Sequence, residues 1–291
     1  MTLLLSLALG LLGSASALAQ NIIHTERSLY RNIVISEESG ERCMKFSRLY
    51  RGSRQSCQLL SDPDRLLFPY TRMMMGSLYL APRPQQILII GLGGGTLPSA
   101  LAKVLPGSDI DVVEIDPAVV RVAGTYFSFK PGARTHVHEE DGRVFVKRAM
   151  RSGKTYDLVM LDAFEQDYIP EHLLTREFLE EVKSVLKPDG VLAANTFSAS
   201  RLYAHESATY AAVFGSFYNL KGSNRVILLR RNGLPPMDEL QRNAAAVEAS
   251  LQPLGMASGD LLPMFVTKPD WSPDTRVLTD RYSPSNLLNG S

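Results

Sequence analysis

One stretch of sequence decides the fold, Ile87-Leu88-Ile89-Ile90-Gly91-Leu92-Gly93-Gly94-Gly95, followed by Val112-Val113-Glu114-Ile115-Asp116. The apolar residues before the first glycine are typical of a strand that is buried on both faces. They run into a tight turn that favours glycine, and a second apolar strand ends in a carboxylate about twenty residues later. In a doubly wound α/β fold, such a turn lies under a nucleotide-like ligand and the carboxylate binds its ribose hydroxyls. The sequence therefore predicts a bound nucleoside.

The spacing of the glycines narrows the kind of nucleoside. A dinucleotide fingerprint, G-x-G-x-x-G, needs glycine at position 96, where this chain has Thr96. Gly91, Gly93 and Gly95 instead form G-x-G-x-G, which suits a ligand whose sugar and amino-acid-like tail lie over the turn without a pyrophosphate. This disfavours a dehydrogenase, and close helix–strand packing is the alternative explanation of the turn.

The composition of the chain and the order of its apolar patterns limit the possible architectures. The chain has 291 residues and a net charge of +1, which argues against a nucleic-acid binder driven by electrostatics. No spacing of His, Cys or acidic residues matches a metal site, so we expect no metal. Strand and helix patterns alternate after residue 85, and short strand candidates precede them. We predict an α/β fold, a Rossmann-like sheet of the class I methyltransferase type preceded by a small antiparallel β domain with a helix over residues 67–80, with divisions at 1–19, 20–80 and 81–291.

The beginning of the chain predicts a location. Residues 2–19 carry no charge and end in Ala17-Leu18-Ala19, so we expect a cleaved signal peptide or, alternatively, a membrane anchor. Either predicts an exported, periplasmic or membrane-anchored protein, and a misassigned start would leave it cytoplasmic. Cys43 and Cys57 would be able to pair in an oxidising compartment, with two free thiols as the equal alternative.

Acidic residues follow two further predicted strands. Asp141, which precedes Gly142, comes after the third strand, where it can meet an adenine amino group or simply cap the next helix. Asp162 directly follows the strand at 157–161, and a carboxylate there needs a cationic or hydrogen-bonding partner. Glu165 lies in an acidic loop that is either functional or only solvated. An acidic cluster beside a nucleoside suits an amine substrate, whose proton a carboxylate accepts or relays through water.

Together these residues resemble the spermidine/spermine synthase, or polyamine aminopropyltransferase, family in its divergent bacterial branch. The resemblance covers most of residues 27–230. It rests on the glycine turn with Glu114 and on Gln55-Ser56, Tyr70, Asp141-Gly142, Tyr156-Asp157-Leu158, Asp162, Ile169-Pro170 and Leu174-Thr175-Arg176-Glu177-Phe178. It implies transfer of an aminopropyl group from decarboxylated S-adenosylmethionine to a polyamine such as putrescine, with release of methylthioadenosine.

The resemblance also implies a role for each site residue. Asp162 would deprotonate or orient the attacking amine, and Tyr70 and Glu165 would bind the polyamine. Glu114 would hold the ribose and Asp141 the adenine of the donor. The remaining donor-binding residues would be Gly91, Gly93, Gly95, Gly142 and Gln55.

Three positions depart from the family pattern. Gly94 stands where the family has an aspartate for the donor's amine, and Arg72 and Gly76 stand where it has Glu and His. The alternatives are therefore a methyl- or alkyltransferase that uses intact S-adenosylmethionine, or a non-catalytic protein that binds a nucleoside or polyamine. As partners we expect a small amine, no nucleic acid, a second copy in a homodimer through the small sheet, and a membrane through residues 2–19.

Overall fold

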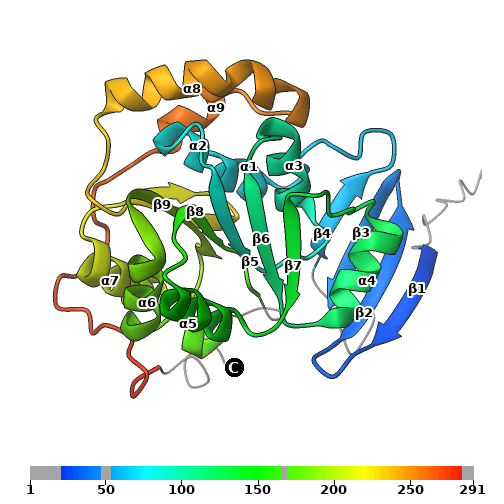
Figure 1. Cartoon of the computed structure of the whole chain (residues 1–291), viewed down its shortest axis with the longest axis horizontal. Helices are drawn as coiled ribbons and strands as arrows, with labels where there is room; N and C mark the ends of the chain where they lie inside the picture. Colours follow the sequence, from blue (N-terminus) through cyan, green and yellow to red (C-terminus); the bar gives the residue numbers. More distant parts are fainter. Residues whose placement is uncertain (1–20, 47–53, 165–168, 284–291) are drawn as a thin grey trace, which may run out of the picture.

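The computed structural model describes residues 21–46, 54–164 and 169–283, which form two sheets with helices around them (Figure 1). A four-stranded sheet has the order β1-β2-β3-β4, and a seven-stranded sheet has the order β10-β11-β9-β8-β5-β6-β7. Both the Rossmann-like sheet and the small antiparallel sheet before it were predicted, and both are confirmed.

The larger sheet has a parallel centre and an antiparallel edge. Five strands run parallel, while β11 is antiparallel to β9 and β10 is antiparallel to β11. The strands are β5 (Gln86–Ile90), β6 (Asp109–Glu114), β7 (Thr135–Glu139), β8 (Tyr156–Leu161), β9 (Leu186–Phe197), β10 (Tyr218–Lys221) and β11 (Asn224–Arg230). From β5 the chain continues on one side through β6 and β7, and then returns to β8 on the other side. Ligands bind at the carboxyl ends of the strands beside such a reversal.

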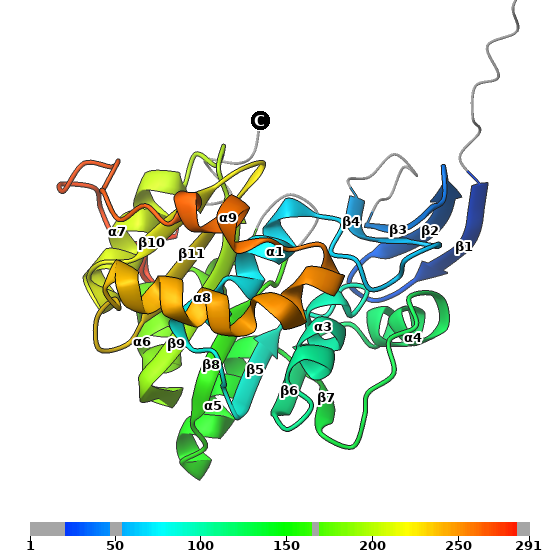
Figure 2. The same ribbon diagram turned by 90° about the horizontal axis from the view of Figure 1, so that it is seen from above.

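Helices cover both faces of this sheet because its strands are apolar on both faces (Figures 1 and 2). Ile87 and Ile89 pack with the helices of one face, while Leu88 and Ile90 pack with those of the other. The first face carries α1 (Pro69–Met75), α2 (Ser77–Leu80), α3 (Thr96–Val104), α8 (Met237–Leu251) and α9 (Ser258–Leu261). The second carries α5 (Gly142–Ser152), α6 (Arg176–Val185) and α7 (Tyr203–Phe214).

The small sheet packs against the larger unit through α4 (Pro117–Tyr126). Its strands are β1 (Asn21–Arg27), β2 (Asn32–Glu38), β3 (Glu41–Phe46) and β4 (Arg54–Leu59). Ile33 and Ile35 of β2 and Met44 of β3 form a buried cluster with Val119 and Val122 of α4. This contact seats the small sheet beside the glycine turn, at the edge where β5 and β6 end (Figure 2).

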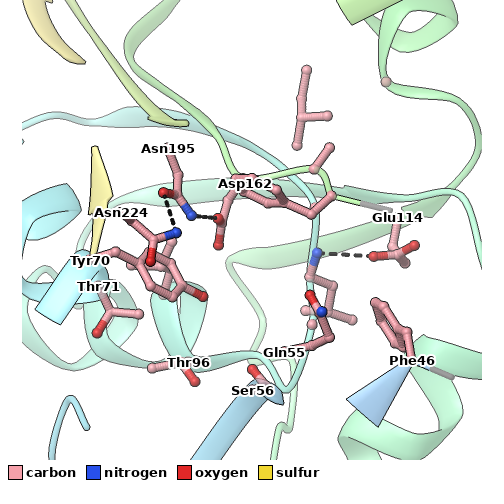
Figure 3. A pocket seen from close by; sticks show the side chains of 18 of the residues that line it. Phe46, Gln55, Ser56, Tyr70, Thr71, Thr96, Glu114, Asp162, Asn195 and Asn224 are labelled. Carbon is pink, nitrogen blue, oxygen red and sulfur yellow. Dashed lines mark hydrogen bonds between the residues drawn. The ribbon is translucent and has the colours of Figure 1, made fainter. Parts of the chain in front are cut away.

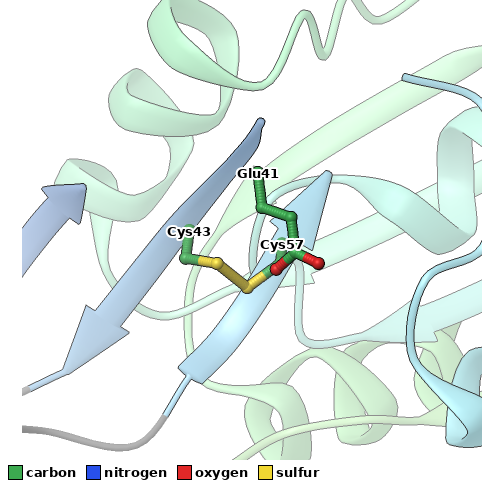
Figure 4. A group of neighbouring side chains, drawn as sticks. All are labelled: Glu41, Cys43 and Cys57. Carbon is green, nitrogen blue, oxygen red and sulfur yellow. A yellow bond between two sulfur atoms is a disulfide. The ribbon is translucent and has the colours of Figure 1, made fainter. Parts of the chain in front are cut away.

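The two cysteines form a disulfide across β3 and β4 (Figure 4). Cys43 and Cys57 are directly opposite each other in the antiparallel register, and both are buried. Among the residues that the structure describes, their sulfurs and the Glu41 carboxylate are the one group whose spacing would allow metal ligation. Since both sulfurs are bonded to each other, neither is a thiolate ligand in this state.

The helix expected over residues 67–80 is divided at Gly76 into α1 and α2. A Cβ atom at this position would lie 2.9 Å from the Met73 carbonyl oxygen and 3.0 Å from Leu261 Cδ2. Glycine therefore lets the segment around α9 pack directly on the break. Strands β1 and β10 were not predicted, because β1 has no buried residue and β10 has only four residues, so neither shows a clear apolar pattern.

The predicted location needs correction. Within the described ranges 21–46, 54–164 and 169–283, no helix has both the length and the apolar character to cross a bilayer. The leader on which the prediction of an exported, periplasmic or membrane-anchored protein rested, residues 2–19, lies outside these ranges. We therefore withdraw that prediction.

Candidate active site

A cavity of about 390 Å³ opens at the carboxyl ends of β5, β6, β8 and β9, beside β4 and α1 (Figure 3). Most of the residues singled out from the sequence line it, namely Gln55, Tyr70, Gly91, Gly93, Glu114, Asp141, Gly142 and Asp162. Gly95 is outside the lining, and Glu165 falls in a segment that the structure does not describe. The topology thus brings together side chains that are more than a hundred residues apart in the sequence.

Gly91 brings the end of β8 against the glycine turn. Its φ is +101°, and a Cβ atom there would lie 2.2 Å from the Asp162 carbonyl oxygen, so only glycine fits. The Asp162 amide donates to the Ile90 carbonyl at 2.8 Å across this contact. Gly95 is the N-cap of α3 with φ +78°, and a Cβ atom there would lie 2.6 Å from the Phe129 ring, so glycine lets Phe129 pack against the turn.

Glu114 is buried at the end of β6 and is oriented by the backbone. Its Oε2 accepts from the Leu92 amide at 3.1 Å, and its Oε1 accepts from the Asp116 amide at 3.0 Å. Burial raises the pKa of the Glu114 carboxyl, while these two backbone donors lower it. Each carboxylate oxygen retains a further lone pair, so the group can also accept from hydroxyls of a ligand.

Asp141 both caps a helix and faces the cavity. Its Oδ1 accepts from the Val144 amide at 3.0 Å at the start of α5, as the capping alternative required. Its Oδ2 lies 2.8 Å from His172 Nε2, and this hydrogen bond holds the pKa of the Asp141 carboxyl below its usual value. At Gly142 a Cβ atom would lie 2.4 Å from Ile90 Cγ2, so glycine is needed for α5 to approach β5.

Asp162 carries the most unusual electrostatics of the cavity. Loss of hydration raises the pKa of its carboxyl to about 7, and the nearby charge of Glu114 adds to the rise. Hydrogen bonds from Asn195 and Tyr70 lower the pKa without cancelling this effect. Asn195 Nδ2 donates to Asp162 Oδ1 at 2.8 Å. A carboxyl that titrates near neutrality can both accept and release a proton at physiological pH.

The departures from the family pattern have structural explanations. The Gly94 amide donates to Ser56 Oγ at 2.9 Å, and a Cβ atom at Gly94 would meet Phe127 at 3.0 Å and Ser56 at 3.1 Å. The space that a side chain would occupy there is therefore filled by β4 and by the residue that follows α4. Arg72 turns away from the cavity and donates to the Leu66 carbonyl.

Sequence reasoning missed several cavity residues that arrive from other elements. They are Arg31, His172, Asn195 and Asn224. The Arg31 guanidinium is 3.7 Å from the Asp116 carboxylate and 4.4 Å from the centre of the Phe46 ring. Asn195 was detectable, because it ends a predicted strand on the edge where ligands bind. The other three residues reach the cavity through reversals of the chain, and no local sequence pattern predicts these reversals.

Comparison with known proteins gives consistent results. Residues 67–221 match the family model described as "Spermine/spermidine synthase domain". The chain is 47% identical over 291 residues to a polyamine aminopropyltransferase of Vibrio vulnificus (strain CMCP6), with 98% of this chain and 97% of that protein aligned.

Two solved structures share the fold. A probable spermidine synthase from Corynebacterium glutamicum ATCC 13032 superposes with a TM-score of 0.66 at 20% identity, over 88% of this chain and 96% of that chain. Human Methyltransferase-like protein 13, solved in complex with SAH, has a TM-score of 0.59 at 28% identity, over 74% of this chain and 100% of that chain. The same architecture therefore occurs in a probable spermidine synthase and in a methyltransferase-like protein.

Proposed function

This chain belongs to the spermine/spermidine synthase family, and on that premise we propose that it is a polyamine aminopropyltransferase. It transfers the aminopropyl group of decarboxylated S-adenosylmethionine to an amine such as putrescine. The acceptor nitrogen forms a bond to the aminopropyl carbon next to sulfur, and the carbon–sulfur bond breaks. Its electron pair stays on sulfur, so methylthioadenosine leaves uncharged, and the one proton released overall is the proton that the acceptor ammonium gives up before it attacks.

The donor is held by the residues at the ends of β5 and β6. Glu114 accepts from the ribose hydroxyls, Asp141 accepts from the adenine amino group, and the turn at Gly91 and Gly93 leaves room for the sugar. Gln55 of β4 contributes from the other side of the cavity. The sulfonium then lies over the turn, where it faces the carboxyl end of β8.

Asp162 orients the acceptor amine and takes its proton, with the hydroxyl of Tyr70 beside it. An ammonium group binds well next to a carboxylate but has no free electron pair, so the proton must leave before attack. The observation that carries the proposal is the placement of the buried Asp162 carboxyl in the same cavity as Glu114, where loss of hydration raises the pKa of Asp162 to about 7. At neutral pH a large fraction of such a carboxyl group is ionised and can bind the ammonium, and the carboxylate is basic enough to accept its proton.

Turnover with a defined donor and acceptor tests this function. The protein is incubated with decarboxylated S-adenosylmethionine and putrescine, and methylthioadenosine is measured by chromatography. We expect release that depends on both substrates. Absence of release in protein that binds the donor, as measured by calorimetry, would contradict transfer and leave a nucleoside-binding protein.

A methyltransferase is the second candidate, and the surroundings of Gly94 favour it. No carboxylate projects from this position to bind the amine of a decarboxylated donor, and Ser56 and Phe127 occupy the space. The resemblance to a methyltransferase-like protein that binds SAH points the same way. Calorimetry with intact and decarboxylated S-adenosylmethionine separates the two, since tighter binding of the intact donor would favour methyl transfer.

A further inference from the structure

A line of three polar side chains joins Asn224 of β11, Asn195 of β9 and Asp162 after β8 (Figure 3). Asn224 Nδ2 donates to Asn195 Oδ1 at 3.2 Å, and Asn195 Nδ2 donates to Asp162 Oδ1 at 2.8 Å. All three side chains line the cavity. The carboxylate therefore receives a hydrogen bond from an amide that is itself held by a second amide.

The register of the strands produces this line. In the antiparallel pair of β9 and β11, Asn195 is opposite Val226 and Asn224 is opposite Phe197. Asn224 is two residues from Val226, so it is a diagonal neighbour of Asn195 on the same face of the sheet. Asn195 follows Ala194, which pairs with Leu161 at the end of β8, and this brings it to Asp162.

The direction of the middle amide matters for the charge of Asp162. A side-chain amide presents donors at one end and an acceptor at the other. With its NH₂ group toward Asp162, Asn195 stabilises the ionised carboxylate. Turned over, its oxygen would face that carboxyl group and would instead accept a hydrogen bond from the protonated, neutral acid, which stabilises the neutral form.

We propose that Asn224 is a positioning residue, which holds Asn195 with its NH₂ group toward Asp162. It donates to the Asn195 oxygen and so disfavours the reversed amide. This inference rests on the proposed function only for its consequence in turnover, because the ionised Asp162 is the form that binds the acceptor and takes its proton. The titratable groups that face Asp162 are Tyr70 from α1 and Glu114 from β6, and neither contacts Asn224 among the interactions found in the described residues.

The test follows the titration of Asp162 itself. Protein labelled with ¹³C at aspartate carboxyls is titrated by NMR, and the Asp162 signal is assigned by its loss in Asp162→Asn. The variants are Asn224→Ala, Asn195→Ala and the double variant, and Asn232→Ala is the matched control, because Asn232 is exposed after β11 and lies outside the cavity lining. Affinity for methylthioadenosine, measured by calorimetry, reports whether each variant keeps a folded donor site.

We expect the midpoint of Asp162 to rise by about one pH unit in Asn224→Ala. In the Asn195→Ala background the same substitution is expected to have no further effect, because the middle amide is gone. The Asn232→Ala midpoint is expected to equal that of the unaltered protein. Equal midpoints in the unaltered protein and Asn224→Ala would overturn the proposal, and so would an undiminished shift in the Asn195→Ala background.

The pH dependence of kcat/KM distinguishes a positioning role of Asn224 from a direct contact with the substrate. At a pH below both midpoints, kcat/KM with putrescine is expected to fall roughly tenfold in Asn224→Ala and to recover at alkaline pH. A KM that rises equally at every pH, with an unchanged midpoint, would identify a direct substrate contact instead. Because the NMR titration needs no turnover, a failure of the proposed aminopropyl transfer and a failure of this inference give different results.

Discussion

The two ends of the cavity are built in different ways. At the donor end, Glu114 is oriented by backbone amides at 3.0 and 3.1 Å, and these amides belong to the same two strand ends that the sequence motif contains. At the acceptor end, Asp162 is surrounded by side chains from α1, β9 and β11. Backbone amides are not changed by most substitutions, whereas hydrogen bonds from side chains can be removed or altered by substituting one residue at a time. The two ends are therefore expected to respond differently to substitution.

Asp162→Asn is the substitution with the largest expected effect, and it acts on the acceptor end alone. The amide cannot take the proton of the amine, so turnover is expected to fall by about a thousandfold, while affinity for methylthioadenosine changes only a few-fold. Asp189→Asn, on an exposed acid at the start of β9, is the matched control. Full activity in Asp162→Asn would remove this residue from catalysis.

Glu114→Ala attacks the donor end and is expected to give the opposite pattern. It removes the proposed acceptor for the ribose hydroxyls and leaves the Leu92 and Asp116 amides without their partner. A charged hydrogen bond of this kind contributes about 2 kcal/mol, so the Kd for methylthioadenosine should rise roughly thirtyfold. Calorimetry measures this effect. If affinity were retained and only turnover lost, the division of labour between the two ends would be wrong.

Ser56→Ala has a smaller expected effect, because Ser56 supports the donor end from the small sheet. The Gly94 amide loses its acceptor, which costs about 1 kcal/mol and weakens methylthioadenosine binding about fivefold. Ser99→Ala in α3 is the matched control. An unchanged Kd in Ser56→Ala would show that β4 does not support the turn.

The two ends of the cavity also differ in how much of their structure could be predicted from the sequence. The runs of apolar residues identified the strands at whose ends Glu114, Asp141 and Asp162 lie, because a buried parallel strand followed by a carboxylate is a local sequence pattern. The contacts of Asn224 depend on the register of β11 against β9, and no local pattern in the sequence specifies that register. The filling of the space at Gly94 by Phe127 and Ser56 is likewise a product of tertiary packing.

The disulfide shows a similar limit. Cys43 and Cys57 were expected either to pair or to remain free, since sequence does not determine which strands lie opposite each other. The register of β3 against β4 places them face to face, and the pair is bonded. The location inferred from the leader failed because it rested on a segment outside the described structure rather than on the fold.

The central claim is that the carboxylate of Asp162 binds and deprotonates the acceptor. Its pKa is raised, so the ionised form is lost as the pH falls through about 7, while the acceptor amine stays protonated across this range. The most direct measurement compares the acid limb of kcat/KM for methylthioadenosine release with the NMR titration of Asp162 in the same protein. We predict that the two midpoints coincide near 7 and that the limb disappears from the residual activity of Asp162→Asn. Separate midpoints, or a limb that persists in that variant, would contradict the account.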